Sequence, residues 1–411
     1  MGNKTLSSFW VIIMLMTTIP LNSWPAETGF RFNNNRRAVT IPITVRNNLA
    51  VIPLEINNRG PFYFILDTGV KTTILTEPMV AHFMGLEADD NILIYGLGGE
   101  GLVEGLIARN VTIGMRGITG YNKNMIIIPE GLLSFSELFG FPVYGIIGYD
   151  FFKQFAMRIN YSREYIKVFR DHDYRVRRRS QKIPLKMVDG KPYIKSKIIG
   201  SDGDTLSTYL LMDMGASHPI YLNNRYMDIS DITMPSFLGK GISGYLMGNI
   251  GRVKKVMLGE TEIKKPLVSY PDADFLHIQG QKIEWEGIIG GEIIKRHEII
   301  LDYPREKLIM RPGINHGRPF NTSLTGLEVA AKGETHQKFI IHYVRPGSTG
   351  YESGIWAGDR IMAINNIPYT QLTMEDVLDK ISGTTGSIIR LTIQRDYEII
   401  TTEITLREDL P

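Results

Sequence analysis

The sequence predicts a mainly β protein in which two equivalent lobes precede a smaller α+β domain. Three observations predict this fold class: short apolar segments that end in turn residues, a repeat of motifs in the first three quarters of the chain, and a change of composition after residue 313. Short strands separated by turn signals are typical of sandwiches and barrels. A chain of 411 residues also has room for two or three domains.

The clearest repeat surrounds two aspartates. Residues 63–70 read Tyr-Phe-Ile-Leu-Asp-Thr-Gly-Val, and residues 209–216 read Tyr-Leu-Leu-Met-Asp-Met-Gly-Ala. Each segment is an apolar strand that runs into an acidic residue and a glycine turn, and a second apolar strand follows it. A single Asp-x-Gly is usually an ordinary turn, because Asp binds its own backbone and Gly accepts positive φ. Duplication of the whole pattern makes a shared site more plausible.

Further motifs recur in the same order after each aspartate. A glycine cluster begins at residue 95 and again at residue 241, and Gly-Ile-Ile-Gly occurs at 145–148 and at 287–290. A β-hairpin is predicted after each of these, over 158–168 and 300–309. We therefore predict two homologous lobes, at 38–172 and 181–313. The arginine run between them, at 175–179, is interpreted as a solvated linker.

Two equivalent turns that meet at a two-fold axis would bring two carboxylates together. Like charges at such a distance do not both ionise easily, so the pair shares one proton and its apparent pKa values separate. The ionised carboxylate then takes a proton from a bound water, while the protonated one polarises a carbonyl. This chemistry needs no metal or cofactor, and we predict neither. The sequence has no cysteine, no H-E-x-x-H and no G-x-S-x-G motif.

The paired turns and the Gly-Ile-Ile-Gly segments resemble the aspartic peptidases, in particular the retropepsin-like branch in a single-chain, two-lobe form. The resemblance implies that Asp67 and Asp213 form the catalytic dyad and that each Gly-Ile-Ile-Gly segment packs beneath the opposing catalytic turn. It implies turn support from Thr68, Gly69, Met214 and Gly215. It further implies flaps that close over a peptide or protein substrate, with the residues Tyr95, Gly96, Gly98, Gly99, Gly241, Gly244 and Tyr245.

Two departures from the pepsin-like pattern affect the expected activity. Val70 and Ala216 follow the turn glycines, where pepsin-like members carry a hydroxyl that binds the catalytic carboxylate. Their apolar side chains should leave the dyad pKa values less depressed, so we expect activity toward mildly acidic or near-neutral pH. Met214 stands where the family has Thr or Ser, so half of the hydrogen-bond exchange between the turns is missing. We favour an active endopeptidase, and a catalytically inactive peptide-binding protein is the alternative. His218, near the second turn, is expected to have a surface or packing role and no catalytic one.

In the last part of the sequence, 322–408, residues 345–361 contain a Pro-Gly-Ser turn followed by Gly-Asp-x-Ile, and Asn365-Asn366 comes next. These motifs resemble those of a PDZ domain. Strands are predicted at 339–344, 360–364 and 388–393, and a helix at 374–381. PDZ domains add an extended peptide to a sheet edge, so the C-terminus of a polypeptide is a possible partner. The acid in the expected carboxylate-binding loop leaves a purely structural cap as the alternative; this loop comprises Gly326, Leu327, Glu328 and Val329.

The N-terminus resembles a secretory signal peptide, which we place at 1–26. Lys4 precedes an apolar stretch from residue 9 to residue 20, which is short for a membrane span. An uncleaved anchor is the alternative. We predict an exported, periplasmic or envelope-associated protein of bacterial type, with no later transmembrane span. Loss of a propeptide near 25–37 stays open. The net charge of +3 carries no basic stripe with interleaved aromatic residues, so we expect no nucleic-acid partner.

Overall fold

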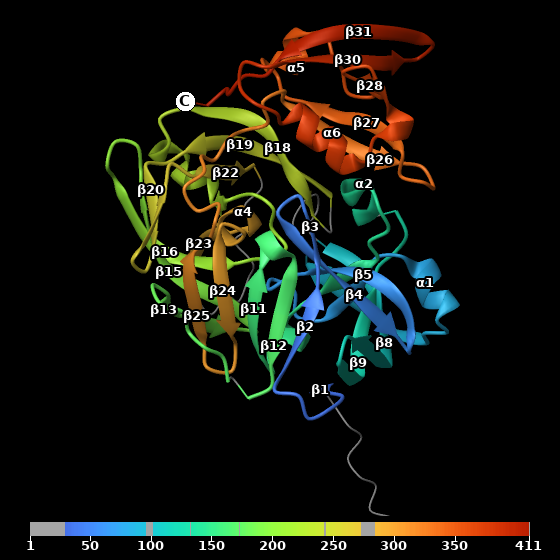
Figure 1. Cartoon of the computed structure of the whole chain (residues 1–411), viewed down its shortest axis with the longest axis vertical. Helices are drawn as coiled ribbons and strands as arrows, with labels where there is room; N and C mark the ends of the chain where they lie inside the picture. Colours follow the sequence, from blue (N-terminus) through green and yellow to red (C-terminus); the bar gives the residue numbers. More distant parts are fainter. Residues whose placement is uncertain are drawn as a thin grey trace, which may run out of the picture.

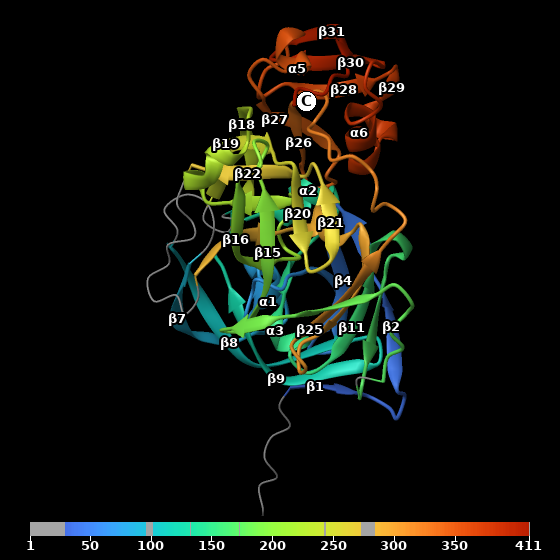
Figure 2. The same cartoon turned by 90° about the vertical axis from the view of Figure 1, so that its left-hand side faces the viewer.

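The protein folds into two β-rich lobes and a third domain at one end of the molecule (Figures 1 and 2). This computed structural model describes residues 29–95, 102–131, 133–171, 173–241, 244–272 and 284–410. The mainly β fold class is confirmed. The predicted signal peptide at 1–26 and the glycines Gly96, Gly98 and Gly99 lie outside the described residues. Within those ranges, no helix is long and apolar enough to span a membrane.

The N-terminal lobe is built on one large sheet with the strand order β1-β9-β6-β10-β5-β4-β8-β7. Its apolar segments become short strands that are buried on both faces. In β5, for example, Phe64, Ile65 and Leu66 are all buried, which explains why the sequence shows a continuous apolar run and no alternation. The strands are β1 (Gly29–Phe32), β3 (Thr44–Arg46), β4 (Leu49–Ile56), β5 (Arg59–Leu66), β6 (Thr73–Leu75), β7 (Ala88–Tyr95), β8 (Leu102–Met115), β9 (Ile118–Ile127) and β10 (Gly145–Ile147).

The C-terminal lobe repeats this sheet with the order β18-β19-β22-β17-β23-β16-β15-β20-β21. The long strand β8 corresponds to β19 and β20 together, and β9 corresponds to β21 and β22. The predicted internal repeat is therefore a repeat of structure. The strands are β14 (Lys186–Val188), β15 (Lys191–Ile199), β16 (Thr205–Met212), β17 (Ile220–Leu222), β18 (Thr233–Gly241), β19 (Gly244–Arg252), β20 (Lys255–Leu258), β21 (Thr261–Lys264), β22 (Leu267–Pro271) and β23 (Trp285–Ile289).

A central sheet joins the two lobes, with the order β13-β25-β24-β11-β12-β2. The pairing is symmetric, because each lobe contributes its hairpin and one strand from the other end of its sequence. At the centre β11 and β24 run antiparallel, with Ile159 opposite Ile299. The predicted hairpins over 158–168 and 300–309 are these elements. The strands are β2 (Ala38–Pro42), β11 (Ala156–Asn160), β12 (Tyr165–Phe169), β13 (Gln181–Pro184), β24 (His297–Asp302) and β25 (Lys307–Pro312).

One buried hydrophobic cluster runs through both lobes, and the third domain has a core of its own. Short helices cover the lobes: α1 (Pro78–Phe83), α2 (Phe135–Phe139), α3 (Tyr149–Phe152) and α4 (Gly291–Ile294), with the short 3-10 helices η1 (Tyr161–Arg163) and η2 (Asn224–Ile229). A continuous core across two lobes means that each lobe buries apolar surface that the other supplies.

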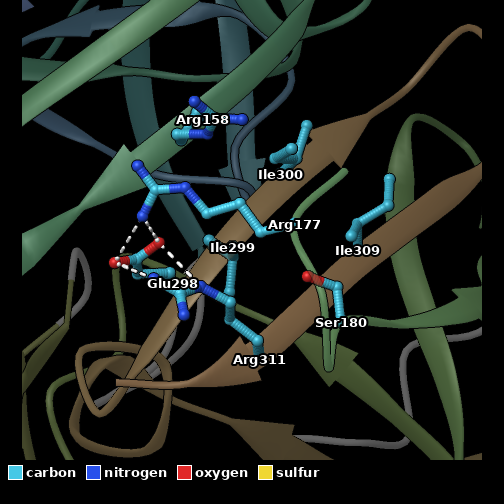
Figure 3. A pocket seen from close by; sticks show the side chains of 8 residues that line it. All are labelled: Arg158, Arg177, Ser180, Glu298, Ile299, Ile300, Ile309 and Arg311. Carbon is cyan, nitrogen blue, oxygen red and sulfur yellow. Dashed lines mark hydrogen bonds and ion pairs between the residues drawn. The ribbon is translucent and has the colours of Figure 1, made fainter. Parts of the chain in front are cut away.

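The arginine-rich linker crosses the outside of the central sheet. Arg177 binds the Glu298 carboxylate with distances of 2.9 and 3.2 Å, and Arg311 binds the same carboxylate. A small depression lies here, lined by Arg158, Arg177, Ser180, Glu298, Ile299, Ile300, Ile309 and Arg311 (Figure 3). The linker is thus fastened to the C-terminal lobe by partly exposed ion pairs, and neither Asp67 nor Asp213 lines the depression.

The third domain is a small sheet with helices, and it matches the predicted α+β pattern. Its strand order is β26-β27-β28-β30-β31, so β26 and β31 form the two edges. The predicted helix at 374–381 is α6, which begins with a capping box between Thr373 and Asp376. Asn365 and Asn366 both have positive φ, as a tight turn requires. The elements are β26 (Leu327–Lys332), β27 (Lys338–Val344), α5 (Thr349–Glu352), β28 (Arg360–Ile364), β29 (Ile367–Pro368), η3 (Tyr369–Gln371), α6 (Met374–Ile381), β30 (Ile388–Arg395) and β31 (Glu398–Thr405).

Strand β1 lies within the stretch 25–37 that the sequence left open as a propeptide. It pairs antiparallel with β9, and Phe30 is 2% exposed. The Phe30 ring makes an edge contact with Phe151 at 5.3 Å, and the Lys123 ammonium lies 5.1 Å from its centre. Residues 29–32 are therefore an integral edge of the N-terminal lobe.

We predict that Phe30→Ala lowers the free energy of unfolding by about 3–5 kcal/mol, because it removes a buried ring and leaves a cavity. Urea unfolding followed by tryptophan fluorescence measures the change. Phe83→Ala is the matched control: this residue is 70% exposed, so the substitution should change stability by no more than about 0.5 kcal/mol. Equal stability of the two variants would show that β1 is dispensable.

Candidate active site

The two aspartates end equivalent strands, Asp67 after β5 and Asp213 after β16. In each lobe the Gly-Ile-Ile-Gly segment forms a strand that runs parallel to its neighbour, with Ile147 beside Leu66 and Ile289 beside Met212. The Asp67 N–H donates to the Ile147 carbonyl at 3.0 Å, and the Asp213 N–H donates to the Ile289 carbonyl at 2.9 Å. The backbone of each aspartate is thereby fixed by its own lobe.

This pairing corrects one expectation. The Gly-Ile-Ile-Gly segments pack beneath the turn of their own lobe, so the expected packing beneath the opposing turn is wrong. The reason is topological, because β10 lies between β5 and β6 of the same sheet. A side chain on Gly148 would come within 2.6 Å of the Asp67 carbonyl oxygen, and one on Gly290 within 2.7 Å of the Ala216 carbonyl oxygen. These glycines let strand and turn approach closely.

The two turns have matching hydrogen bonds. The Gly69 N–H donates to Asp67 Oδ1 at 2.6 Å, and the Gly215 N–H donates to Asp213 Oδ1 at 2.8 Å. The glycines also admit the opposing carboxylate: a Cβ on Gly69 would lie 2.9 Å from Asp213 Oδ2, and a Cβ on Gly215 would lie 2.3 Å from Asp67 Oδ2. Both turns therefore need glycine so that the two carboxyl groups can meet at the lobe interface.

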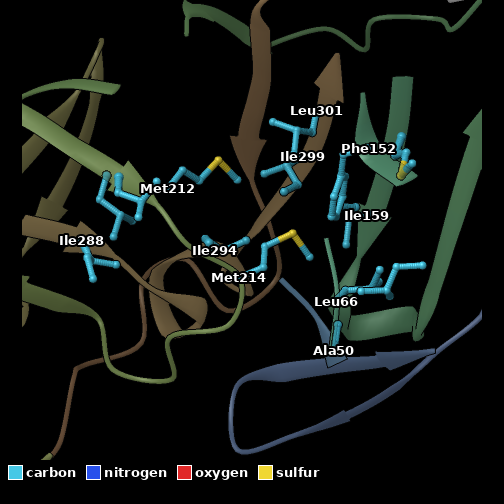
Figure 4. Packing of buried hydrophobic residues seen from close by; sticks show 14 of the residues in the cluster. Ala50, Leu66, Phe152, Ile159, Met212, Met214, Ile288, Ile294, Ile299 and Leu301 are labelled. Atoms are coloured by element: carbon cyan, nitrogen blue, oxygen red, sulfur yellow. The ribbon is translucent and has the colours of Figure 1, made fainter. Parts of the chain in front are cut away.

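Thr68 connects the two turns. Its hydroxyl donates to the Met212 carbonyl oxygen at 2.6 Å and accepts from the Met214 N–H at 3.1 Å. Met214 has no hydroxyl with which to return these bonds, so the link is one-sided, as the sequence predicted. The Met214 side chain instead is fully buried and lies among Ile159, Ile294 and Ile299 at the lobe interface (Figure 4). Apolar packing takes the place of the second pair of hydrogen bonds.

Burial and proximity shape the ionisation of the pair. Each aspartate is 9% exposed. The pKa of Asp67 is raised well above its ordinary value, first because burial removes water, then because the Asp213 charge lies close and a hydrogen bond joins the two carboxyl groups. The Gly69 N–H and the Lys191 charge lower the pKa of Asp67, but the raising effects are larger. Two adjacent buried carboxyl groups in this arrangement favour one shared proton between them.

Two tyrosines near the dyad were not identified from the sequence as site residues. Tyr161 and Tyr303 follow β11 and β24 at equivalent positions, and the hydroxyl of each is buried without a hydrogen-bond partner among the described residues. The pKa of Tyr303 is raised well above its ordinary value. Burial is the main cause, and the charges of Asp67 and Asp213 raise the pKa further. The repeated Asn-Tyr and Asp-Tyr pairs at the ends of the predicted hairpins were the signal that could have found them.

Of the surface or packing role expected for His218, the structure shows packing. Its Nδ1 lies 2.6 Å from the Ser269 hydroxyl, and its ring stacks on Tyr221 at 5.3 Å. Burial lowers the pKa of His218 to about 4, so the ring is neutral at physiological pH. In the part of the protein that the structure describes, no three His, Asp or Glu side chains gather as a metal site requires.

The predicted flaps are hairpins. Tyr95 ends β7, and the tip between β7 and β8 lies outside the described residues. In the second hairpin Gly241 pairs with Gly244, and Tyr245 is 60% exposed. The Tyr245 ring makes an edge contact with Phe237 at 5.8 Å and stacks on His342 of the third domain at 6.3 Å. This second flap therefore contacts a domain outside the two lobes.

Of the predicted peptide-binding loop, only Gly326 precedes the edge strand β26, and Leu327, Glu328 and Val329 are the first residues of that strand. Gly326 has positive φ, and Leu327 and Val329 belong to the domain core. Burial raises the pKa of Glu328 to about 7, and the Arg345 charge opposes this shift. The Gly326 N–H donates to the Ser323 carbonyl and the Leu327 N–H to the Thr325 hydroxyl, so neither is available to a carboxylate in this state.

Two family models match separate parts of the sequence. Residues 52–151 match the family model for aspartyl proteases, and residues 340–395 match the model for PDZ domains. Among solved structures, the aspartic proteinase from Irpex lacteus matches with 11% sequence identity and a TM-score of 0.45, over 68% of this protein and 99% of that one. A comparison with curated proteins gave no match.

The protein thus contains an aspartyl protease domain. The two-lobed sheet with its paired Asp-x-Gly turns and the family match at 52–151 identify this part. The domain that follows is a PDZ domain, identified by the match at 340–395 and by the sheet with the edge strand β26. Both resemblances that the sequence suggested are confirmed.

We predict that Thr68→Val destabilises the protein by roughly 1–3 kcal/mol, because it leaves the buried Met214 N–H and the Met212 carbonyl without their partner. Chemical unfolding measures the change. Thr68→Ser retains the hydroxyl and should lose much less stability. If Val and Ser variants were equally stable, the hydroxyl link between the turns would not contribute.

The raised pKa of Asp67 also predicts how stability depends on pH. The folded state binds this proton more tightly than the unfolded state, so the associated stability is present below the ordinary carboxyl pKa of about 3.9 and is lost as pH rises through the raised value. Asp67→Asn does not titrate, so it should gain stability over the wild type as pH rises above about 4. Thermal unfolding between pH 3 and 8 tests this. Asp202→Asn, on an exposed turn, is the control; a constant difference across pH would contradict the shift.

Proposed function

We propose that this protein is an aspartic-type endopeptidase that cleaves peptide or protein substrates with a water molecule activated by Asp67 and Asp213. The observation that supports this most is the mutual approach of the two turns, in which each glycine leaves room for the carboxylate of the other lobe. Two carboxyl groups with one proton supply both a base and an acid.

In the proposed mechanism, Asp67 acts as the acid because burial and the neighbouring charge raise its pKa. Asp213 then accepts a proton from the attacking water, while Asp67 donates a hydrogen bond to the scissile carbonyl. The Gly69 and Gly215 N–H groups hold one oxygen of each carboxyl group in place. The apolar surroundings strengthen these interactions by excluding water.

We further propose that the PDZ domain recruits or regulates through an extended peptide, and that the protein is exported to the periplasm or cell envelope. The proposal of export rests on the apolar N-terminal stretch after Lys4. A polypeptide C-terminus as PDZ partner has less support, since the N–H groups of Gly326 and Leu327 are engaged within their own loop.

A catalytically inactive peptide-binding protein is the second candidate. The one-sided link through Thr68 favours it, because Met214 cannot return the hydrogen bonds. The retained glycines favour the enzyme, since a binding protein has no need for two carboxylates pressed together in a buried site.

Cleavage of fluorescein-labelled casein by the purified protein tests the proposal. We expect activity that pepstatin inhibits and that Asp67→Asn and Asp213→Asn each reduce by roughly 10²- to 10⁴-fold. Activity should extend toward mildly acidic or near-neutral pH and fall as Asp67 loses its proton. Asp202→Asn is the control. Equal inactivity of the wild type and both dyad variants, after removal of any N-terminal segment, would favour the binding protein.

A further inference from the structure

The PDZ domain contacts both peptidase lobes at once. On the N-terminal lobe, α2 packs along the edge strand β26. Gly140, which ends α2, lies against Met374 at the start of α6; a Cβ on this glycine would meet Met374 Cβ at 2.4 Å. Arg46, at the end of β3, forms an ion pair with Glu375 at 2.7 Å. Figure 1 shows α2 below β26 and α6.

The contact with α2 closes the approach to the peptide groove. In its own sheet β26 has a free edge, and α6 packs beside it, which is the arrangement that binds a peptide as an added strand. The segment that contacts β26 and the first residue of α6 is α2 with Gly140. A peptide that pairs with β26 and reaches α6 must therefore displace this segment.

The PDZ domain also contacts the second flap. His342 and Tyr343 of β27 meet the hairpin β18–β19: the His342 ring makes an edge contact with Phe237 at 4.9 Å and stacks on Tyr245, while Tyr343 lies 5.9 Å from Phe237. Burial lowers the pKa of His342 to about 4, so this is a contact between neutral rings. The flap from one lobe is thus tied, through the PDZ domain, to the other lobe.

We propose that these two contacts form an autoinhibitory clamp, in which α2 closes the peptide groove while β27 restrains the second flap. An extended peptide that enters the groove displaces α2, and the released domain frees the flap to open and close over substrate. The clamp would regulate the proposed active site, and the regulatory part of the inference therefore rests on the proposed function. The clamp itself is a domain contact that exists whether or not the protein is an enzyme.

Charge reversal provides a reversible test of the clamp. Arg46→Glu places two like charges together and should open it, whereas the double variant Arg46→Glu/Glu375→Arg restores an ion pair and should close it again. We expect the single variant to raise kcat/KM on labelled casein at least threefold, mainly through a lower KM, and the double variant to return it to the wild-type value. His342→Ala should raise kcat/KM similarly, and Tyr397→Ala, at a fully exposed position of the same domain, should not.

The absence of cysteine allows a test within one molecule. Arg46→Cys/Glu375→Cys, joined by a bismaleimide that contains a disulfide, locks the clamp, and a reductant then releases it. We expect kcat/KM to rise at least threefold on reduction. The matched control is Lys255→Cys/Glu262→Cys, which replaces an ion pair of 2.9 Å within the C-terminal lobe and should show no change. If the locked and released protein both cleave casein and do so equally well, the regulation is overturned.

Two readouts do not depend on activity. Fluorophores on Met79→Cys and Tyr397→Cys report the distance between the N-terminal lobe and the PDZ domain, and this distance should increase in the Arg46→Glu background. A fluorescein-labelled pool of random decapeptides should bind the Arg46→Glu protein at least threefold more tightly than the charge-swapped protein. An unchanged distance would overturn the clamp. So would equal peptide binding by the Arg46→Glu and charge-swapped proteins, or no binding by either. Inactivity of every variant, with the distance change present, would refute the peptidase and retain the clamp.

Discussion

The site depends on bringing two carboxyl groups together inside a protein. Burial and mutual repulsion both oppose this, and the pKa of Asp67 rises because the fold enforces it. The backbone holds the two carboxyl groups in this position. Each aspartate N–H is bound by a parallel strand of its own lobe, and each turn glycine leaves room for the opposing carboxylate. The sheets, the shared core and the central sheet together hold these two turns against each other.

The link between the turns shows how one interaction can replace another. Thr68 makes both of its hydrogen bonds across the interface, and Met214 makes none through its side chain but fills the space at the centre of the core. Hydrogen bonds restrict the relative orientation of the two turns, whereas a flexible thioether side chain fills the space between them. The two halves of the dyad are therefore supported by different physical means, even though their backbones are closely equivalent.

Much of the fold could be predicted because the same pattern of motifs occurs in both lobes, so each lobe supports the interpretation of the other. The β-hairpins, the helix at 374–381 and the turns at Asp67 and Asp213 follow from local patterns that few structures can satisfy. What escaped prediction involves contacts between distant segments. Nothing near Gly140 or His342 in the sequence indicates that one meets α6 and the other meets a flap, because such contacts depend on how finished domains pack. The role of β1 was missed for a similar reason, since four residues carry too little periodicity to indicate a strand.

The central sheet has a consequence for the order in which the protein matures. Strand β11 needs β24 as its partner, and β24 lies far later in the sequence, close to the end of the second lobe. During synthesis the first lobe must therefore wait with an open strand edge and an incomplete core, which is the state most prone to wrong pairing. Neither half of the dyad has its counterpart during this interval. A protein with this architecture is therefore unable to assemble its site before almost the whole of both lobes has emerged.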